Sequence, residues 1–258
     1  GASCTTGISG NGDIVVNDAI RWDSPYNLIL LAHHSVILNA PLSLSGESSG
    51  LTLMANTAGT DAASNDSGIA INAPVTVSGA AASVNLTATA IADITDSGIT
   101  YGYGGQLTFS SHTSSGVASG HLTINGHAYT LIASMSQLDS LDSVDASCNT
   151  GTCRLDPFVF NPQYIALASD LDAGHLNYYR PLLALSYGIT ASLYSPVAFD
   201  GLGHTISNLK IDTRNDVLNP SPTFSTRTGL FGFFNTATSI ANLGLSDVDV
   251  NGTQAVGG

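Results

Sequence analysis

An eight-residue stretch that occurs twice in the chain decides the fold. It first reads Asn39-Ala40-Pro41-Leu42-Ser43-Leu44-Ser45-Gly46 and returns 33 positions later as Asn72-Ala73-Pro74-Val75-Thr76-Val77-Ser78-Gly79. The same offset separates Leu51-Thr52-Leu53-Met54-Ala55 from Val84-Asn85-Leu86-Thr87-Ala88. Because two separate words repeat at one spacing, the chain has an internal repeat of the kind that builds repeat architectures.

Each repeat unit consists of short runs in which apolar and polar residues alternate, separated by Gly, Asn, Pro or Ser. Alternation with a period of two is typical of β-strands. A degenerate earlier copy starts at Ile14 and continues at Leu28. Short strands in a common register favour a parallel β-solenoid, whose coils stack about 4.8 Å apart around a continuous apolar core. A β-sandwich also has alternating strands, but it does not explain repeated words at equal spacing.

We therefore predict an all-β chain in which the repeated units stack in register. Asn39 and Asn72 are expected at equivalent corners of successive coils. The composition agrees with this, because residues that usually cover helix surfaces are scarce. The chain has one lysine, Lys210, and one glutamate, Glu47.

The charge of the chain excludes several partners. Its 258 residues include 19 acidic and 6 basic side chains, which gives a formal net charge of −13. Because so few basic groups cannot neutralise a phosphate backbone, nucleic acid is not expected as a partner. An anionic membrane surface would also repel the chain. The longest apolar stretches fall far short of the roughly 20 residues that span a bilayer, so membrane insertion is not expected either.

Three segments of the chain differ in pattern. Residues 1–105 carry the solenoid repeats, residues 106–163 combine strands, a helix and a loop, and residues 164–258 return to short strands. The helix is expected to begin at Ser134, because Ser134 and Gln137 have the form of a capping box. Apolar residues then recur at a spacing of three and form one stripe: Met135, Leu138, Leu141 and Val144.

The last segment resembles bacterial surface proteins that carry GLUG repeats. Several words occur in the order of such a repeat: Phe199-Asp200-Gly201-Leu202-Gly203-His204-Thr205-Ile206, Gly229-Leu230-Phe231-Gly232, Ile240-Ala241-Asn242-Leu243-Gly244-Leu245 and Val248-Asp249-Val250. The stretch from Tyr164 to Asp172 resembles the element that precedes these repeats.

The first segment resembles the shaft of filamentous-haemagglutinin-like exoproteins, which are secreted by the two-partner route. The Asn-Ala-Pro-Leu and Leu-Thr-Leu-Met-Ala units carry this similarity. Together the two resemblances imply a right-handed parallel β-helix that is secreted to the bacterial cell surface. They also imply an outer-membrane secretion partner and a role in adhesion or in the biofilm matrix.

The sequence contains no recognisable catalytic, cofactor or metal motif. The histidines lack metal-ligand spacing, so structural roles are expected for them. Asp170 and Asp172 are spaced by two, as are Asp247 and Asp249, so each pair shares one face of a strand. Such pairs can hold Ca²⁺ or cleave a glycan, but a solvated outer face is the favoured interpretation.

Candidate binding residues lie where the repeat pattern breaks, over residues 145–163 and 212–228. These stretches contain three of the six basic residues: Arg154, Arg214 and Arg227. In an acidic chain, local positive groups are where an anionic sugar or a carboxylate is tolerated. The alternative is that both loops only decorate the rod.

Aromatic residues offer a second kind of candidate. Tyr178 and Tyr179 are adjacent, and Tyr101 and Tyr103 are separated by one glycine. Exposed rings of this kind stack on sugars, because their faces are apolar and their edges polar. The alternative is that these rings cover the solenoid core or a corner.

These observations predict a structural and adhesive segment of a large exported bacterial adhesin, without catalytic activity. Such a segment attaches cells to a surface, to one another or to a matrix, and its partner is an extracellular polysaccharide or a glycan or protein of a cell surface. One alternative is a carbohydrate-active β-helix enzyme of the lyase or hydrolase type. Another is a glycan-binding module that does no chemistry.

Cys148 and Cys153 are predicted to form a disulfide. Four residues rich in turn formers separate them, which suits a small loop better than a zinc site. Titration of thiols under denaturing, non-reducing conditions is expected to find at most Cys4 reactive. Three reactive thiols would contradict the disulfide.

Overall fold

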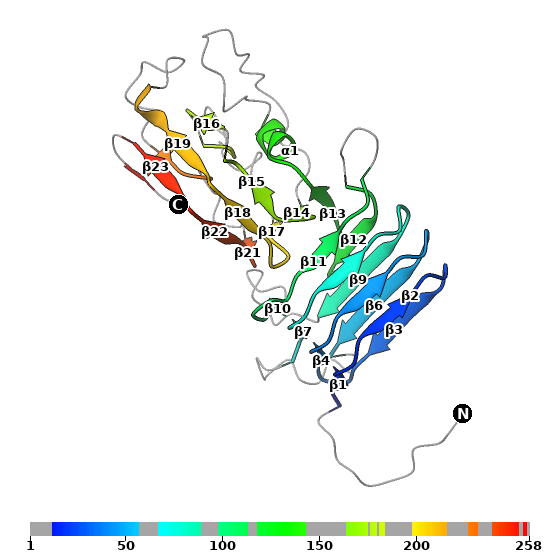
Figure 1. Cartoon of the computed structure of the whole chain (residues 1–258). Coiled ribbons are helices and arrows are strands. Elements are labelled where there is room, and N and C mark those ends of the chain that lie inside the picture. Colours follow the sequence, from blue (N-terminus) through cyan, green and yellow to red (C-terminus); the bar gives the residue numbers. More distant parts are fainter. Residues whose placement is uncertain are drawn as a thin grey trace, which may run out of the picture.

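The computed structural model is an all-β chain of short, mostly parallel strands stacked into coils (Figure 1). It describes residues 12–56, 67–88, 98–112, 118–142, 164–174, 176–179, 181–183, 198–215, 227–231, 239–252 and 255–256. The predicted parallel β-solenoid is confirmed. The coils form two successive stacks, which we call the first solenoid (strands β1–β12) and the second solenoid (strands β13–β24).

Each coil of the first solenoid contributes one strand to each of three parallel sheets. The first sheet contains β1 (Ile14–Val16), β4 (Val36–Leu38), β7 (Ile69–Ile71) and β10 (Ile99–Tyr101). The second contains β2 (Ile20–Trp22), β5 (Leu42–Leu44), β8 (Val75–Val77) and β11 (Leu107–Phe109). The third contains β3 (Asn27–Leu31), β6 (Gly50–Ala55), β9 (Ser83–Ala88) and β12 (His121–Ile124).

The register of these strands is the register of the sequence repeat. Leu42 pairs with Val75 and Leu51 pairs with Val84, so the repeated words lie directly above one another. Leu42 and Leu44 are fully buried, and Ser43 between them faces outward. Full burial of such an aliphatic side chain contributes about 1.5–3 kcal/mol. The alternation seen in the sequence therefore reflects one apolar interior shared by all coils.

An asparagine ladder joins the corners of three successive coils. The Asn72 Nδ2 group donates to Asn39 Oδ1 at 2.9 Å, and Asn39 Nδ2 donates to Asn17 Oδ1 at 3.0 Å. The predicted equivalence of Asn39 and Asn72 is confirmed. Each amide has a donor and an acceptor on opposite sides, so a stack of amides at one corner satisfies itself.

The direction of the chain reverses after β12, which the repeat pattern did not indicate. β13 (His127–Ile132) runs antiparallel to β12, and Asn125 and Gly126 connect them with φ angles of 50° and 81°. Two central residues with positive φ are typical of a type I′ hairpin turn, for which Asn-Gly is the preferred pair. The same sheet then continues past this pair, so one eight-stranded sheet crosses from the first solenoid to the second.

The second solenoid repeats the three-strand coil with shorter strands. β14 (Tyr164–Leu167), β17 (Ala198–Asp200) and β21 (Ser239–Ala241) extend the shared sheet. β15 (Leu171–Asp172), β18 (Thr205–Ser207) and β22 (Gly244–Ser246) form a second sheet, and β16 (Asn177–Tyr178), β19 (Lys210–Asp212) and β23 (Asp249–Asn251) form a third. A further pair joins β20 (Arg227–Thr228) to β24 (Ala255–Val256).

The predicted helix is confirmed as a short segment that covers the second solenoid. α1 (Met135–Asp139) continues into a 3₁₀ turn over Ser140–Asp142. Ser134 Oγ accepts from the backbone N–H of Gln137, while the Gln137 side chain accepts from the N–H of Ala133. Met135 and Leu138 are buried, as their place on the apolar stripe predicts. Val144 lies outside the described residues.

Each solenoid has its own hydrophobic core, and the two meet at a junction. Four buried residues of the first core come from the second solenoid: Leu131, Ala166, Ala168 and Leu202. The second core begins at Ile132, directly after Leu131 of the first. The segment boundaries at residues 105 and 163 remain predictions, and residues 143–163 lie outside the described ranges.

The asparagine ladder predicts measurable coupling between coils. Replacing Asn39 or Asn72 with alanine removes the same hydrogen bond, so a double-mutant cycle is expected to give a coupling of about 1 kcal/mol in the free energy of unfolding. Pairing Asn39→Ala with Asn177→Ala, an exposed residue of the second solenoid, serves as the control and is expected to show none. Equal coupling in the two cycles would contradict a specific ladder.

Candidate functional site

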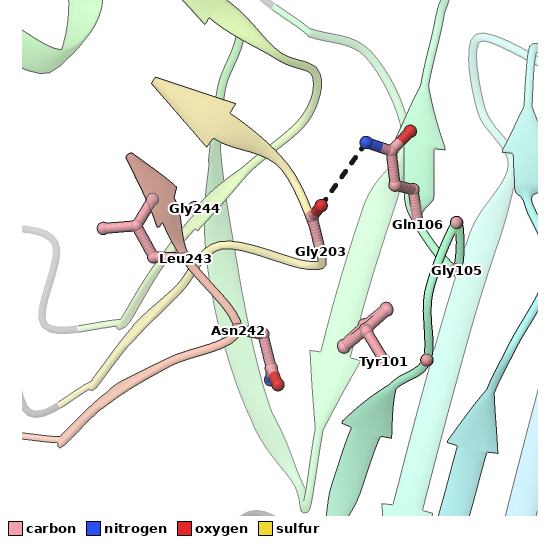
Figure 2. A pocket seen from close by; sticks show the side chains of 9 residues that line it. Tyr101, Gly105, Gln106, Gly203, Asn242, Leu243 and Gly244 are labelled. Carbon is pink, nitrogen blue, oxygen red and sulfur yellow. Dashed lines mark hydrogen bonds between the residues drawn. The ribbon is translucent and has the colours of Figure 1, made fainter. Parts of the chain in front are cut away.

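A pocket of about 290 Å³ lies at the junction of the two solenoids (Figure 2). Its lining comes from two turns of the second solenoid and from the turn between β10 and β11 of the first. The lining residues are Tyr101, Gly102, Gly104, Gly105, Gln106, Gly203, Asn242, Leu243 and Gly244. The wall is therefore mostly glycine backbone, with two amide side chains.

Backbone hydrogen bonds fix the two sides of the junction to each other. β11 is an edge strand, and the N–H groups of Leu107 and Phe109 donate to the carbonyl groups of Leu202 and Ala168 at 3.0 and 2.9 Å. A Cβ atom on Gly203 would lie 2.3 Å from Gly105 O, and the φ of Gly203 is +81°. Only glycine fits this position, because backbone meets backbone there.

Gln106 spans the mouth of the junction. Its Nε2 group donates to Gly203 O and to Asp170 Oδ1, both at 3.3 Å (Figure 2). Both partners are acceptors, which fixes the orientation of the amide. The opposite atom, Gln106 Oε1, has no donor from the described part of the protein.

His204 forms a buried connection beneath this contact. The ring is 1% exposed, with Nε2 3.0 Å from Leu107 O and Nδ1 3.2 Å from Asp170 Oδ1. A carbonyl oxygen can only accept, so Nε2 carries a proton and donates to Leu107. Asp170 also accepts from the N–H of Thr205 at 2.9 Å. His204 and Asp170 thus bind the second solenoid to the edge strand of the first.

Asp200 is the most strongly perturbed carboxyl group at the junction. It is 3% exposed, and this burial raises its pKa from 3.8 to about 6, although the hydrogen bonds from Leu202 and Asn242 act in the opposite direction. The Leu202 N–H donates to Asp200 Oδ1 at 2.8 Å, and Asn242 Nδ2 donates to both carboxyl oxygens. Leu202 has a φ of 52°, which is rare for leucine, and the Asp200 side chain supports this turn.

Two tyrosines lie near this carboxyl group. Burial, and then the charge of Asp200, raises the pKa of Tyr101 well above 10.0, and the same two causes raise the pKa of Tyr129. The Tyr101 hydroxyl is buried and finds no partner among the described residues. Both phenols therefore remain protonated and neutral at physiological pH. Tyr103, two residues further on, is fully exposed, so the two rings of the Tyr-Gly-Tyr word do not share one environment.

Tyr178 does not have the exposed position that was proposed for it. It is fully buried in the second core, because its place on β16 directs the ring inward. The alternative, that such rings fill the solenoid core, is correct for Tyr178. Its neighbour Tyr179 is half-buried at the end of the strand.

Of the three candidate arginines, the structure describes the side chain of Arg214 alone, and Arg214 is not among the residues that line the junction pocket. Arg214 is paired with Asp212, with Nε 2.8 Å from Oδ1 and a terminal nitrogen 2.6 Å from Oδ2. This pairing neutralises the charge that was expected to attract an anion. Arg227 lies in β20 and pairs through its backbone with Ala255. Arg154, Cys148 and Cys153 lie outside the described residues.

Three of the four paired aspartates accept hydrogen bonds from nearby residues or from the neighbouring coil. Asp172 Oδ1 accepts from the N–H of Gly174 and from Asn208 Nδ2, at 2.8 and 2.9 Å. Asp249 accepts from Asn251 at 2.6 Å, while Asp247 has a φ of 51° and forms a corner. Among the described residues, no three His, Cys, Asp or Glu side chains are grouped so as to hold a metal ion.

The residues that gather at the junction were mostly missed by sequence reasoning. Gln106 lies in no motif, and the GLUG-like words that contain Asp200 and Asn242 assigned these side chains no role, because each acquires its role from a partner distant in the chain. The sequence feature nearest to this pocket was the stretch Tyr101-Gly102-Tyr103-Gly104, because Gly102 and Gly104 line the pocket.

Comparison with known proteins gives no relative. No family model, no curated protein and no solved structure matches this chain. The resemblances to filamentous-haemagglutinin-like and GLUG-repeat proteins therefore remain predictions. Within the described ranges, no helix has the length and apolar character needed to cross a membrane.

The raised pKa of Asp200 predicts a stability that depends on pH. The folded chain binds this proton more tightly than the unfolded chain, so the stabilisation is present at low pH and is lost as the pH rises from about 4 through about 6. The change amounts to about 3 kcal/mol. Denaturant unfolding across this range is expected to show the decrease in the native protein and not in Asp200→Asn. Parallel pH profiles for the two proteins would contradict it.

Proposed function

We propose that this chain is a structural and adhesive segment of an exported bacterial surface protein, and that it attaches cells to a matrix, to a surface or to one another. In this role the stacked coils form a rigid spacer. The loops that leave the coils, and the junction between the two solenoids, contact the partner. The chain performs no catalysis. The partners are extracellular polysaccharide or the glycans and proteins of a cell surface, with an outer-membrane partner for export.

The observation that carries the proposal is the continuous stack of coils. An eight-stranded sheet runs from β3 to β21 through both solenoids, so every inner strand of this sheet is hydrogen-bonded on both sides. The scaffold is stiff because it combines hydrogen-bonded strands, an apolar core and corner asparagines that are hydrogen-bonded to one another. Its stability does not depend on surface charge. Such a scaffold suits a protein that transmits force outside the cell.

Display on a non-adherent bacterial cell tests the adhesive role. Cells that carry the chain are expected to be retained under flow several times more than control cells, on glass coated with biofilm polysaccharide or on a layer of other cells. The matched control is the Leu44→Asp, Leu53→Asp variant at equal surface level. Both leucines are fully buried, so two charges prevent the core from forming. Equal retention of the two strains would contradict adhesion by the folded chain.

A carbohydrate-active enzyme is the alternative that the same preparation tests. Glycoside hydrolysis requires two carboxyl groups that face one substrate space. Asp170 instead accepts from the N–H of Thr205 in the next coil, Asp172 accepts from the N–H of Gly174 in its own turn, and Asp200 is buried beneath the junction. Incubation with acidic and neutral polysaccharides is expected to produce no new reducing ends. Their appearance would favour the enzyme.

A further inference from the structure

We propose that the junction pocket binds one residue of a neutral sugar, with Tyr103 at its rim as a stacking platform. The biological purpose of this sugar site rests on the proposed adhesive function, because the sugar is the ligand that an adhesive segment would hold. The volume of about 290 Å³ lies at the lower end of the range for ligand pockets, about 300–1,000 Å³. It therefore suits a single sugar ring and not a long chain.

The polar groups of the pocket favour a ligand rich in hydroxyl groups. Asn242 Nδ2 donates to the Asp200 carboxyl group, and Gln106 Nε2 donates to Gly203 O. The oxygen atom of each amide therefore points away from these partners. In the described part of the chain, no protein group donates to Asn242 Oδ1 or Gln106 Oε1. Gln106 and Asn242 line the pocket, one from each solenoid, so these two acceptors are available to the hydroxyl donors of one ligand.

The charge around the pocket favours a neutral ligand over an anion. Among the residues that the structure describes, no lysine or arginine lines the pocket, while two carboxyl groups, those of Asp170 and Asp200, accept hydrogen bonds from its lining residues Gln106 and Asn242. An anionic sugar would be repelled without a compensating cation. This differs from the expectation based on the arginine loops, because Arg214, the one loop arginine whose side chain the structure describes, is paired with Asp212.

An exposed aromatic ring completes the site. Tyr103 follows Gly102 and precedes Gly104, both of which line the pocket, and its side chain is fully exposed at 107%. Only a large, apolar face of a ligand gives such a ring a contact, and the C–H face of a pyranose is one. The turn that carries Tyr103 is closed by a hydrogen bond from the Gly105 N–H to Gly102 O at 2.9 Å, so the ring leaves the chain between two residues that line the pocket.

The test uses a panel of purified oligosaccharides and isothermal titration. The neutral members are lactose, cellotetraose, maltotetraose and chitotetraose, the anionic member is tetragalacturonate, and the cationic member is the fully deacetylated glucosamine tetramer. At least one neutral member is expected to bind, weakly, and to bind better than both charged members. Binding of only a charged member, or of none, would overturn the proposal.

Two variants with matched controls locate the binding. Gly104→Asn places a side chain in the pocket wall, and its Cβ meets no atom within 4 Å at a φ of +82°. Gly126→Asn is the control, with a φ of +81°, equally open surroundings and a position away from the pocket. Asparagine tolerates this conformation, so both variants are expected to fold. Gly104→Asn is expected to abolish sugar binding, and Gly126→Asn to leave it unchanged.

Tyr103→Ala is expected to weaken binding by about tenfold, the scale of one aromatic contact. Its control is Tyr26→Ala, which removes another exposed ring, 76% exposed, at the far end of the first solenoid. Melting temperatures establish that all four variants are folded. Equal affinities for a variant and its control would overturn the pocket assignment. Titration in solution tests sugar binding by the pocket, and retention under flow tests adhesion. The sugar site and the adhesive function can therefore be refuted independently.

Discussion

The open end of the first solenoid is the constraint on which the rest of the structure depends. A coil buries its apolar residues only against another coil, and an edge strand leaves its backbone groups unpaired. After β11 and β12 no further coil of the same kind follows. The Asn125-Gly126 hairpin reverses the chain, and Ala168 and Leu202 of the second solenoid then cover the exposed core and accept from the edge strand.

This closure accounts for the polar groups buried at the junction. A turn that delivers Leu202 to the neighbouring core requires a positive φ, and the Asp200 carboxyl group stabilises that turn by accepting from the Leu202 N–H. The same position removes Asp200 from water, which raises its pKa. His204 satisfies Leu107 O where no strand is available to do so. The junction is therefore joined by specific hydrogen bonds as well as by packing.

The pocket follows from the same geometry. Two curved stacks that meet through turns cannot fill all the space between them, and glycines at the closest approach keep the walls thin. Two candidate binding residues on the coils are instead engaged within the fold. Arg214 and Tyr178 illustrate this, since one is paired with Asp212 and the other is part of the core.

The sequence by itself determined the parallel coils, their register and the equivalence of Asn39 and Asn72, because these depend on patterns that recur locally. It also determined α1, because the capping box and the apolar stripe that define this helix are formed by neighbouring residues. Only the tertiary structure decided the reversal at Asn125 and the meeting of Gln106, Asp200 and Asn242. The physical reason is that these three residues are far apart in the chain and acquire partners only when the second solenoid closes the end of the first.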